Sequence, residues 1–174
     1  MKNDEYAKYR DEAFIERLGV ELEKMPLSEF WPKNGPQWDA LGRSSSGKLF
    51  LVEAKSHISE LISTLKAENE NSIRKIQESL RKTKHYLNSR TNFDWSKGFY
   101  QYTNRLAHLY LLKENDLQAY LLFVYFMNDS EMNGPTSVQE WEGAVKLLHS
   151  CLATNQLKLK KDVIQIFIDV KHLQ

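Results

Sequence analysis

The chain has little of what holds a small extracellular or fibrous protein together: 174 residues contain one cysteine, seven glycines and four prolines. Cys151 alone can form no intrachain disulfide and no cysteine-based metal framework, which is typical of a reducing compartment. The scarcity of Gly and Pro excludes fibrous and low-complexity classes, and a hydrophobic content of 41 % excludes wholesale disorder. We expect one domain over residues 1–174, located in the cytoplasm.

Net charge and long apolar runs are also lacking. The chain has 24 Lys and Arg against 23 Asp and Glu, so any surface for nucleic acid must be a local patch. No apolar run approaches the roughly 18 residues that a membrane helix needs, and the N-terminus is too polar for a signal peptide. The sequence therefore predicts no contact with a membrane.

Hydrophobic periodicity predicts alternating helices and strands. Helical spacing covers residues 4–24, 58–88 and 97–113, and the capping box Ser137–Glu140 opens a further helix that ends near residue 152. Strands are expected at 30–31, 37–43, 48–55, 119–127 and 163–169, the fourth of them apolar enough to be buried on both faces. The order α-β-β-β-α-α-β-α-β predicts an α/β fold, a mixed sheet covered by helices on both faces.

Two familiar types of binding motif are incomplete or absent in this sequence. Residues 42–49 resemble a phosphate-binding P-loop, but Leu49 stands where a Ser or Thr should reach the metal, and the segment opens a strand instead of a helix. The five histidines show no zinc-ligand spacing. Nucleotide and zinc sites of these types are therefore not expected.

The chemistry is expected in the hairpin that joins residues 37–43 to residues 48–55. A three-residue loop with Gly47 at its left-handed position pairs residues whose numbers sum to 92, so Asp39 faces Glu53. Strand alternation puts Glu53 and Lys55 on one face, and a divalent cation such as Mg²⁺ or Mn²⁺ would relieve the repulsion between the two carboxylates. Two alternatives stay open. A four-residue loop would place the carboxylates on opposite faces, and Glu53 with Lys55 could be an ordinary ion pair.

A helix followed by a β-meander that carries Asp39, Glu53 and Lys55, and then by helix and strand, resembles the PD-(D/E)XK nuclease superfamily with its restriction-endonuclease-like core. Trp38 stands in place of the proline before the aspartate. The resemblance implies that Asp39, Glu53 and the Ala54 carbonyl bind Mg²⁺ or Mn²⁺ and that Lys55 activates the attacking water. It also implies an acidic ligand from the first helix, for which Glu16 is preferred over Glu12.

Other polar side chains could line the same site. On the helix 97–113, four polar residues form one stripe: Gln101, Asn104, Arg105 and His108. By the resemblance, Gln101 and Arg105 contact substrate phosphate, and His57 is a further pocket residue; a solvent-facing helix side and a surface histidine are the simpler alternatives. The cations Arg74, Arg81 and Lys84 could follow a phosphate backbone, or belong to a solvated helix face.

These features predict a metal-dependent nuclease that hydrolyses phosphodiester bonds of DNA. The alternative is a catalytically silent module of the same fold that binds nucleic acid or a protein. The sequence leaves open DNA or RNA, endo- or exonuclease action, and the oligomeric state, with a homodimer or another protein partner both compatible with it.

Overall fold

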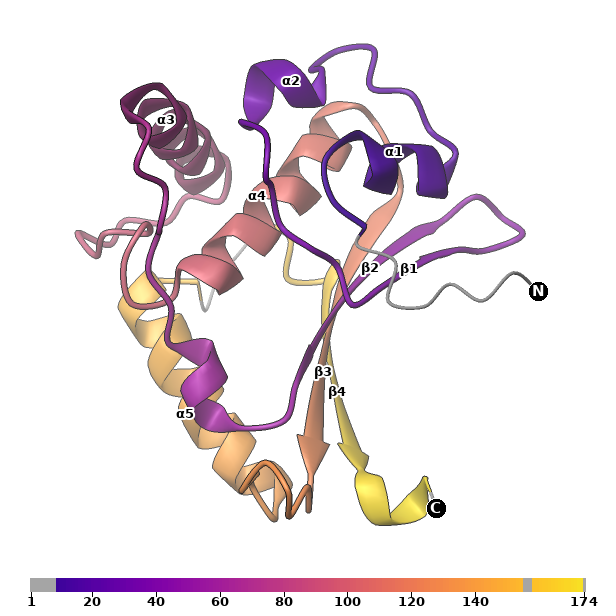
Figure 1. Cartoon of the computed structure of the whole chain (residues 1–174), viewed down its shortest axis with the longest axis vertical. Coiled ribbons are helices and arrows are strands. Elements are labelled where there is room, and N and C mark those ends of the chain that lie inside the picture. Colours follow the sequence, from indigo (N-terminus) through magenta and orange to yellow (C-terminus); the bar gives the residue numbers. More distant parts are fainter. Residues whose placement is uncertain (1–8, 155–157, 174) are drawn as a thin grey trace.

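A computed structural model of the chain describes residues 9–154 and 158–173. It is an α/β structure with a mixed four-stranded sheet in the order β1-β2-β3-β4 (Figure 1). The strands are β1 (Ala40–Arg43), β2 (Leu49–Lys55), β3 (Ala119–Met127) and β4 (Val163–Asp169). β1 runs antiparallel to β2, whereas β2, β3 and β4 are parallel neighbours. The strands expected at 48–55, 119–127 and 163–169 are confirmed.

The helices are α1 (Glu12–Leu18), α2 (Leu27–Phe30), α3 (Glu70–Tyr86), α4 (Tyr100–Glu114) and α5 (Val138–Leu152). Two short 3₁₀ helices, η1 (Ile58–Leu61) and η2 (Val170–His172), complete the described elements. The N-cap expected at Ser137 is confirmed, because its Oγ accepts a hydrogen bond from the Glu140 amide; the Glu140 carboxylate accepts from the Ser137 hydroxyl, whereas a full capping box would use the Ser137 amide. Among the described residues, no helix is long and apolar enough to cross a membrane.

The N-terminal part differs from the sequence-based expectation. In place of a helix over 4–24, α1 covers only Glu12–Leu18, because Gly19 adopts a left-handed conformation (φ 63°) that ends it. The part of the expected helix before residue 9 lies outside the described residues. The strand expected at 30–31 is wrong: Phe30 ends α2, which starts after Pro26. The expected strand 37–43 is regular only from Ala40 onward.

The single helix expected over 58–88 is also wrong, because it consists of η1, an extended segment and α3. Asn69, which interrupts the apolar stripe, is the N-cap of α3: its side chain accepts the Ser72 amide at 3.0 Å. The extended segment pairs with residues 96–100, since the amides of Ser63 and Leu65 donate to the carbonyls of Gly98 and Ser96 at 2.8 and 2.9 Å. This pairing fixes the chain beside the start of α4.

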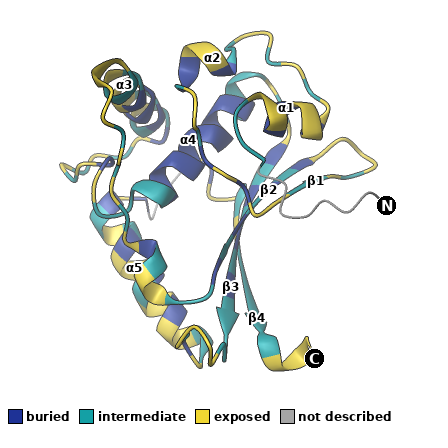
Figure 2. Cartoon of the chain, viewed as in Figure 1, coloured by how far each residue is buried: buried dark blue, intermediate teal, exposed yellow. Residues whose placement is uncertain are grey.

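The helices that pack on the sheet lie on one of its faces. Tyr102 of α4 stacks on Phe123 of β3 at 4.6 Å, and Trp141 of α5 contacts Tyr125 at 4.7 Å. Figure 1 shows the helices gathered on that side, and Figure 2 shows much of β3 and β4 in the colour for intermediate burial. The expectation of helices on both faces, and of a β3 buried on both, is therefore not met: side chains along β3 alternate between buried and half-buried up to Tyr125.

The polar stripe of α4, for which a solvent-facing side was the simpler alternative, is largely inside the protein. Asn104, Arg105 and His108 are buried, as are the apolar residues on the opposite side of the helix. His108 lies among the rings of four aromatic residues: Phe14, Phe30, Trp31 and Trp38. Burial lowers the pKa of His108 to about 3, so its imidazole is neutral at physiological pH. A polar stripe on this helix thus marks an internal network.

Candidate active site

The hairpin between β1 and β2 has the register that its turn predicts. Ala40 pairs with Val52 and Arg43 with Leu49, so paired numbers sum to 92. Gly47 takes a left-handed φ of 81°, and the Ser44 amide donates to the Lys48 carbonyl at 2.9 Å. The regular pairing begins at Ala40: Asp39 lies in a bend one residue before β1, and its amide donates to the carbonyl of Val52, the partner of Ala40. The alternative of a four-residue loop, which would separate the two carboxylates, is excluded.

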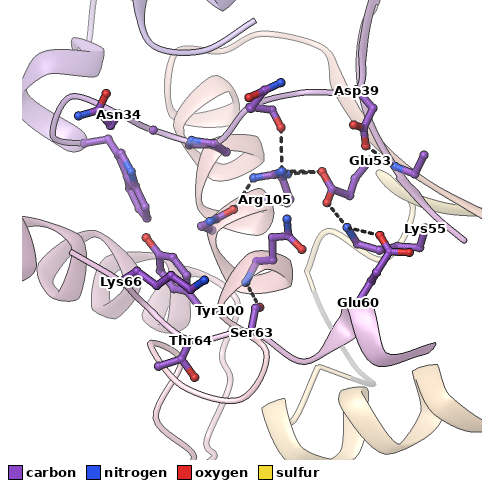
Figure 3. Close-up of a pocket in the computed structure, with 17 residues that line it drawn as sticks. Asn34, Asp39, Glu53, Lys55, Glu60, Ser63, Thr64, Lys66, Tyr100 and Arg105 are labelled. Carbon is purple, nitrogen blue, oxygen red and sulfur yellow. Dashed lines mark hydrogen bonds and ion pairs between the residues drawn. The ribbon is translucent and has the colours of Figure 1, made fainter. Parts of the chain in front are cut away.

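The two carboxylates and Lys55 open on one cavity of about 580 Å³ (Figure 3). β2 alternates strictly, so Glu53 and Lys55 point with the buried leucines toward the helical side of the sheet. α4 contributes Tyr100, Gln101, Asn104 and Arg105 to the cavity wall. The charged residues that line it are three acids, Asp39, Glu53 and Glu60, and three bases, Lys55, Lys66 and Arg105. The cavity therefore carries no net formal charge.

Asp39 is exposed and is held by the backbone of the neighbouring strand. Its Oδ2 accepts a hydrogen bond from the Ala54 amide at 2.7 Å, and its own amide donates to the Val52 carbonyl at 3.2 Å. These two contacts fix the carboxylate at the point where β1 begins. Because the carboxylate is exposed, it can bind a cation without a large desolvation cost.

Glu53 is only 2 % exposed and has two cationic partners. Its Oε1 accepts from Lys55 Nζ at 2.6 Å, and its Oε2 accepts from Arg105 Nε at 2.7 Å and lies 2.6 Å from Arg105 Nη2. The expected repulsion between Asp39 and Glu53 is therefore offset within the protein itself. A cation is not required to relieve strain at this site.

Arg105 does not reach out for substrate, as the resemblance implied, but holds Glu53. Its Nη1 donates to Asn104 Oδ1 and its Nη2 to the Gln37 carbonyl, both at 2.8 Å, and its guanidinium lies 4.8 Å from the centre of the Trp38 ring. All three of its nitrogens are engaged and the residue is buried. Arg105 thus ties α4, β2 and the segment before β1 together at the cavity floor.

Glu60 is a site residue that sequence reasoning missed. Its Oε1 accepts the amides of Ser56 and His57 at 2.9 and 3.1 Å, and its Oε2 lies 3.8 Å from Lys55 Nζ. Lys55 therefore stands between two carboxylates, Glu53 and Glu60. The available signal was the spacing of Glu60 three residues after His57, which is that of a capping box, although such boxes normally begin with Ser or Thr.

Not every expected residue reaches the cavity. Gln101 lines the cavity, and its backbone amide donates a hydrogen bond to Ser63 Oγ at 2.7 Å. His57 lies beside Glu60, with its Nε2 3.4 Å from Glu60 Oε1, but is not part of the cavity wall. Glu12 and Glu16 are exposed on α1 and do not line the cavity either, so the acidic ligand expected from the first helix is not in place.

Asp11, just before α1, does not line the cavity but holds two residues that do. Its carboxylate accepts the amides of Gly35 and Asn34 at 2.8 and 3.0 Å. Both of these residues line the cavity, so Asp11 fixes part of its wall. The acidic residue near the first helix therefore has a supporting role here.

The opposite wall carries a neutral phenol. Burial raises the pKa of Tyr100 to about 12, against smaller opposing effects of Asn104 and Arg105. Tyr100 faces the cavity beside Lys66, across from the carboxylates (Figure 3). It can donate or accept a hydrogen bond at any physiological pH.

The donors suit a hard cation only in part. Within the described residues, no three His, Cys, Asp or Glu side chains gather in a metal-binding group. Asp39, Glu53 and a backbone carbonyl such as that of Ala54 remain, and Mg²⁺ commonly binds through one or two carboxylates while keeping several waters. The residues present therefore fit a site with two carboxylates, provided that Glu53 shares its lone pairs with Lys55 and Arg105.

Comparison with known proteins gives no relative: no family model, no curated protein and no solved structure matches the chain.

Proposed function

We propose that the chain is a metal-dependent phosphodiesterase with a restriction-endonuclease-like core, acting on nucleic acid and most simply on DNA. The observation that carries the proposal is the convergence of Asp39, Glu53 and Lys55 on one cavity from two antiparallel strands. Asp39 is exposed and uses Oδ2 to accept the Ala54 amide, which leaves Oδ1 for a cation. The resemblance to PD-(D/E)XK nucleases rests on these three residues.

Charge balance favours a metal-dependent reaction. A phosphodiester is anionic, and a cavity lined by three acids and three bases offers it no net attraction. Asp39 and Glu53 would hold a divalent cation, which would make the cavity positive and would supply Lewis-acid polarisation of the phosphate. An anion-binding module without a metal would be expected to carry an excess of bases.

Each residue of the cavity has its own role in the proposed reaction. Asp39 and Glu53, with the Ala54 carbonyl, would hold the cation. Lys55 uses one of its three N–H donors on Glu53, so the others are available to orient a water or a phosphate oxygen in the cavity. Arg105 fixes the orientation of Glu53, and Gln101 and Tyr100 offer neutral hydrogen bonds from the opposite wall.

The decisive experiment separates cleavage from binding. Lys55→Ala should lower the rate of cleavage of DNA in Mg²⁺ or Mn²⁺ at least about 100-fold, because the transition state no longer has a positioned donor. Affinity for DNA in Ca²⁺ should stay within a few-fold of wild type, since the other groups that hold the DNA backbone remain. Lys48→Ala, in the exposed hairpin turn, is the matched control and should leave both quantities unchanged.

Two outcomes would count against this function. Cleavage by the Lys55→Ala protein at the wild-type rate would place the activity elsewhere. A wild-type protein that binds nucleic acid but does not cut single- or double-stranded DNA or RNA would favour the second candidate, a silent module of this fold. The engagement of both Glu53 oxygens by Lys55 and Arg105 is the observation that favours that second candidate.

A further inference from the structure

The face of the sheet that points away from the helices carries apolar side chains. Within residues 9–154 and 158–173, a helix reaches it at its margin, where Nζ of Lys113 in α4 lies 5.4 Å from the centre of the Tyr120 ring. The strands place nine apolar residues on this face: Phe50, Val52, Tyr120, Leu122, Val124, Phe126, Ile164, Ile166 and Ile168. We call this set the open sheet face. All nine are at least partly accessible, and Ile164 is 39 % exposed, whereas their strand neighbours Leu51, Phe123 and Tyr125 are fully buried on the helical side.

The open sheet face is apolar in every row across the strands. Val52 pairs with Leu122, which pairs with Ile164; Ala54, Val124 and Ile166 form the next row. Phe126 pairs with Ile168, and Phe50 stacks on Tyr120 at 5.6 Å. An antiparallel or mixed sheet that faces water normally alternates apolar and polar positions, whereas these rows contain no charged side chain. A face of this kind is typical of a buried interface.

Its area suits a second copy of the chain. The four strands have 4, 7, 9 and 7 residues, which at about 3.3 Å per residue and about 4.8 Å between strands span about 430 Å² in projection. The accessible area of corrugated side chains exceeds their projection, so two such faces together bury about 1,000 Å² or more, which is the range of a specific interface. We propose that two copies of this chain pack through their open sheet faces to form a dimer.

A second copy suits this face better than an unlike partner for two reasons. The face has no charge pattern that would select a partner of opposite charge, and apolar rows are complementary to themselves in a two-fold arrangement. Two twisted sheets can pack about 10 Å apart with their strands rotated by roughly 30°, as in a β-sandwich. The strand β4, at the edge of the sheet, would then be shielded on its exposed apolar side.

The dimer leaves the candidate active site accessible. Glu53 and Lys55 point to the helical side of β2, opposite to Val52 and Phe50. Two cavities would therefore open on the outer sides of the dimer. This proposal is independent of the proposed nuclease function, and its test needs no activity.

The test measures mass against concentration by sedimentation equilibrium for the full chain. The wild type should approach twice its monomer mass of 20.4 kDa at micromolar concentrations. Ile164→Glu and Val124→Lys should weaken association at least about ten-fold, because each buries a charge in the apolar interface. Leu147→Glu is the matched control: this leucine is 63 % exposed on α5, away from the open sheet face, and the variant should remain dimeric.

The two variants separate a loss of association from a loss of folding. Ile164 is already exposed in the monomer, so Ile164→Glu should retain the wild-type circular dichroism and a cooperative melting transition even if Val124→Lys does not. Its melting temperature should fall only by the stabilisation that association gives the wild type. A hydrophobic dye should bind the monomeric Ile164→Glu protein more strongly than the wild-type dimer. The proposal is overturned if the wild type stays monomeric up to about 100 µM, or if a wild-type dimer is unaffected by Ile164→Glu. A wild-type monomer that binds the dye strongly would mean that something other than a second copy covers this face.

Discussion

At the scale of single residues, the site is organised around one buried carboxylate. Glu53 would be costly to bury alone, and the chain offsets that cost with Lys55 from the same strand and Arg105 from α4. Lys55 is near in sequence and was recognised there. Arg105 is 52 residues away, and only the packing of α4 against β2 shows that its partner is a protein carboxylate.

Arg105→Met should therefore destabilise the fold as well as the site. Removal of one member of a buried ion pair leaves an uncompensated charge, so we expect a decrease of about 3 kcal/mol in the free energy of unfolding. Urea denaturation monitored by circular dichroism measures it. Arg81→Met, on the exposed face of α3, is the control and should change little. The double variant Glu53→Gln/Arg105→Met should be destabilised by less than the sum of the two single effects; full additivity would mean that the two residues do not act as a pair.

His108 predicts a pH dependence of stability. Its pKa falls from 6.5 to about 3 on folding because the ring is buried, so below pH 6.5 the unfolded chain binds a proton that the folded chain does not. Its contribution to stability is thus complete above pH 6.5 and is lost as the pH falls toward 3, by about 1.4 kcal/mol per pH unit. His108→Met should flatten the decline between pH 6 and 4 in urea titrations. An unchanged slope would show that other groups cause the decline.

At the scale of elements, α3 carries the basic residues that were expected to follow a phosphate backbone. Arg74 and Arg81 are exposed, Lys84 is half-buried, and α3 packs against α4, whose other residues line the cavity. The helix begins at Glu70, so its cations belong to a shorter and more sharply bounded element than the sequence predicted. A nucleic acid that reaches the cavity could follow this helix.

Substitution of Arg74, Arg81 and Lys84 by Gln should weaken DNA binding for all sequences alike. The salt dependence should flatten by roughly 0.9 in the slope of log affinity against log salt for each phosphate that the variant no longer neutralises. Fluorescence anisotropy in Ca²⁺ across a salt series measures both effects. Lys160→Gln with Lys161→Gln, exposed in the segment before β4, is the control. If the triple variant binds as the wild type does, α3 is a solvated face and nothing more.

At the scale of the whole molecule, a cation held by the folded state alone should stabilise it. At ten times its dissociation constant the stabilisation is about 1.4 kcal/mol, which raises the melting temperature of a chain of this length by roughly 3–6 °C. Asp39→Asn should remove this response to Mg²⁺ or Mn²⁺. Because Glu53 already has Lys55 and Arg105 as partners, the same variant should change the melting temperature without metal only slightly. A wild type with no response at millimolar metal would favour the silent module.

The sequence by itself determined what depends on neighbours along the chain. The alternation of β2, the turn at Ser45–Gly47 and the N-cap of α5 are local, so the strand, the register of the hairpin and the start of that helix could be predicted. The bounds of β3 and β4 could also be predicted, because each strand is a continuous, largely apolar run. The helix boundaries near Gly19 and Asn69 were missed because left-handed caps and side-chain caps override a continuous apolar stripe.

Only the tertiary structure decided what depends on contacts between distant segments. The engagement of Glu53 by Arg105, the supporting role of Asp11, and the burial of His108 among aromatic rings each join residues at least 23 positions apart. The one-sided helix layer was likewise invisible in the sequence, because a strand that is apolar on both faces looks the same whether a helix or a second copy covers it. Periodicity records which side chains avoid water, whereas the identity of the surface that shields them is set by packing.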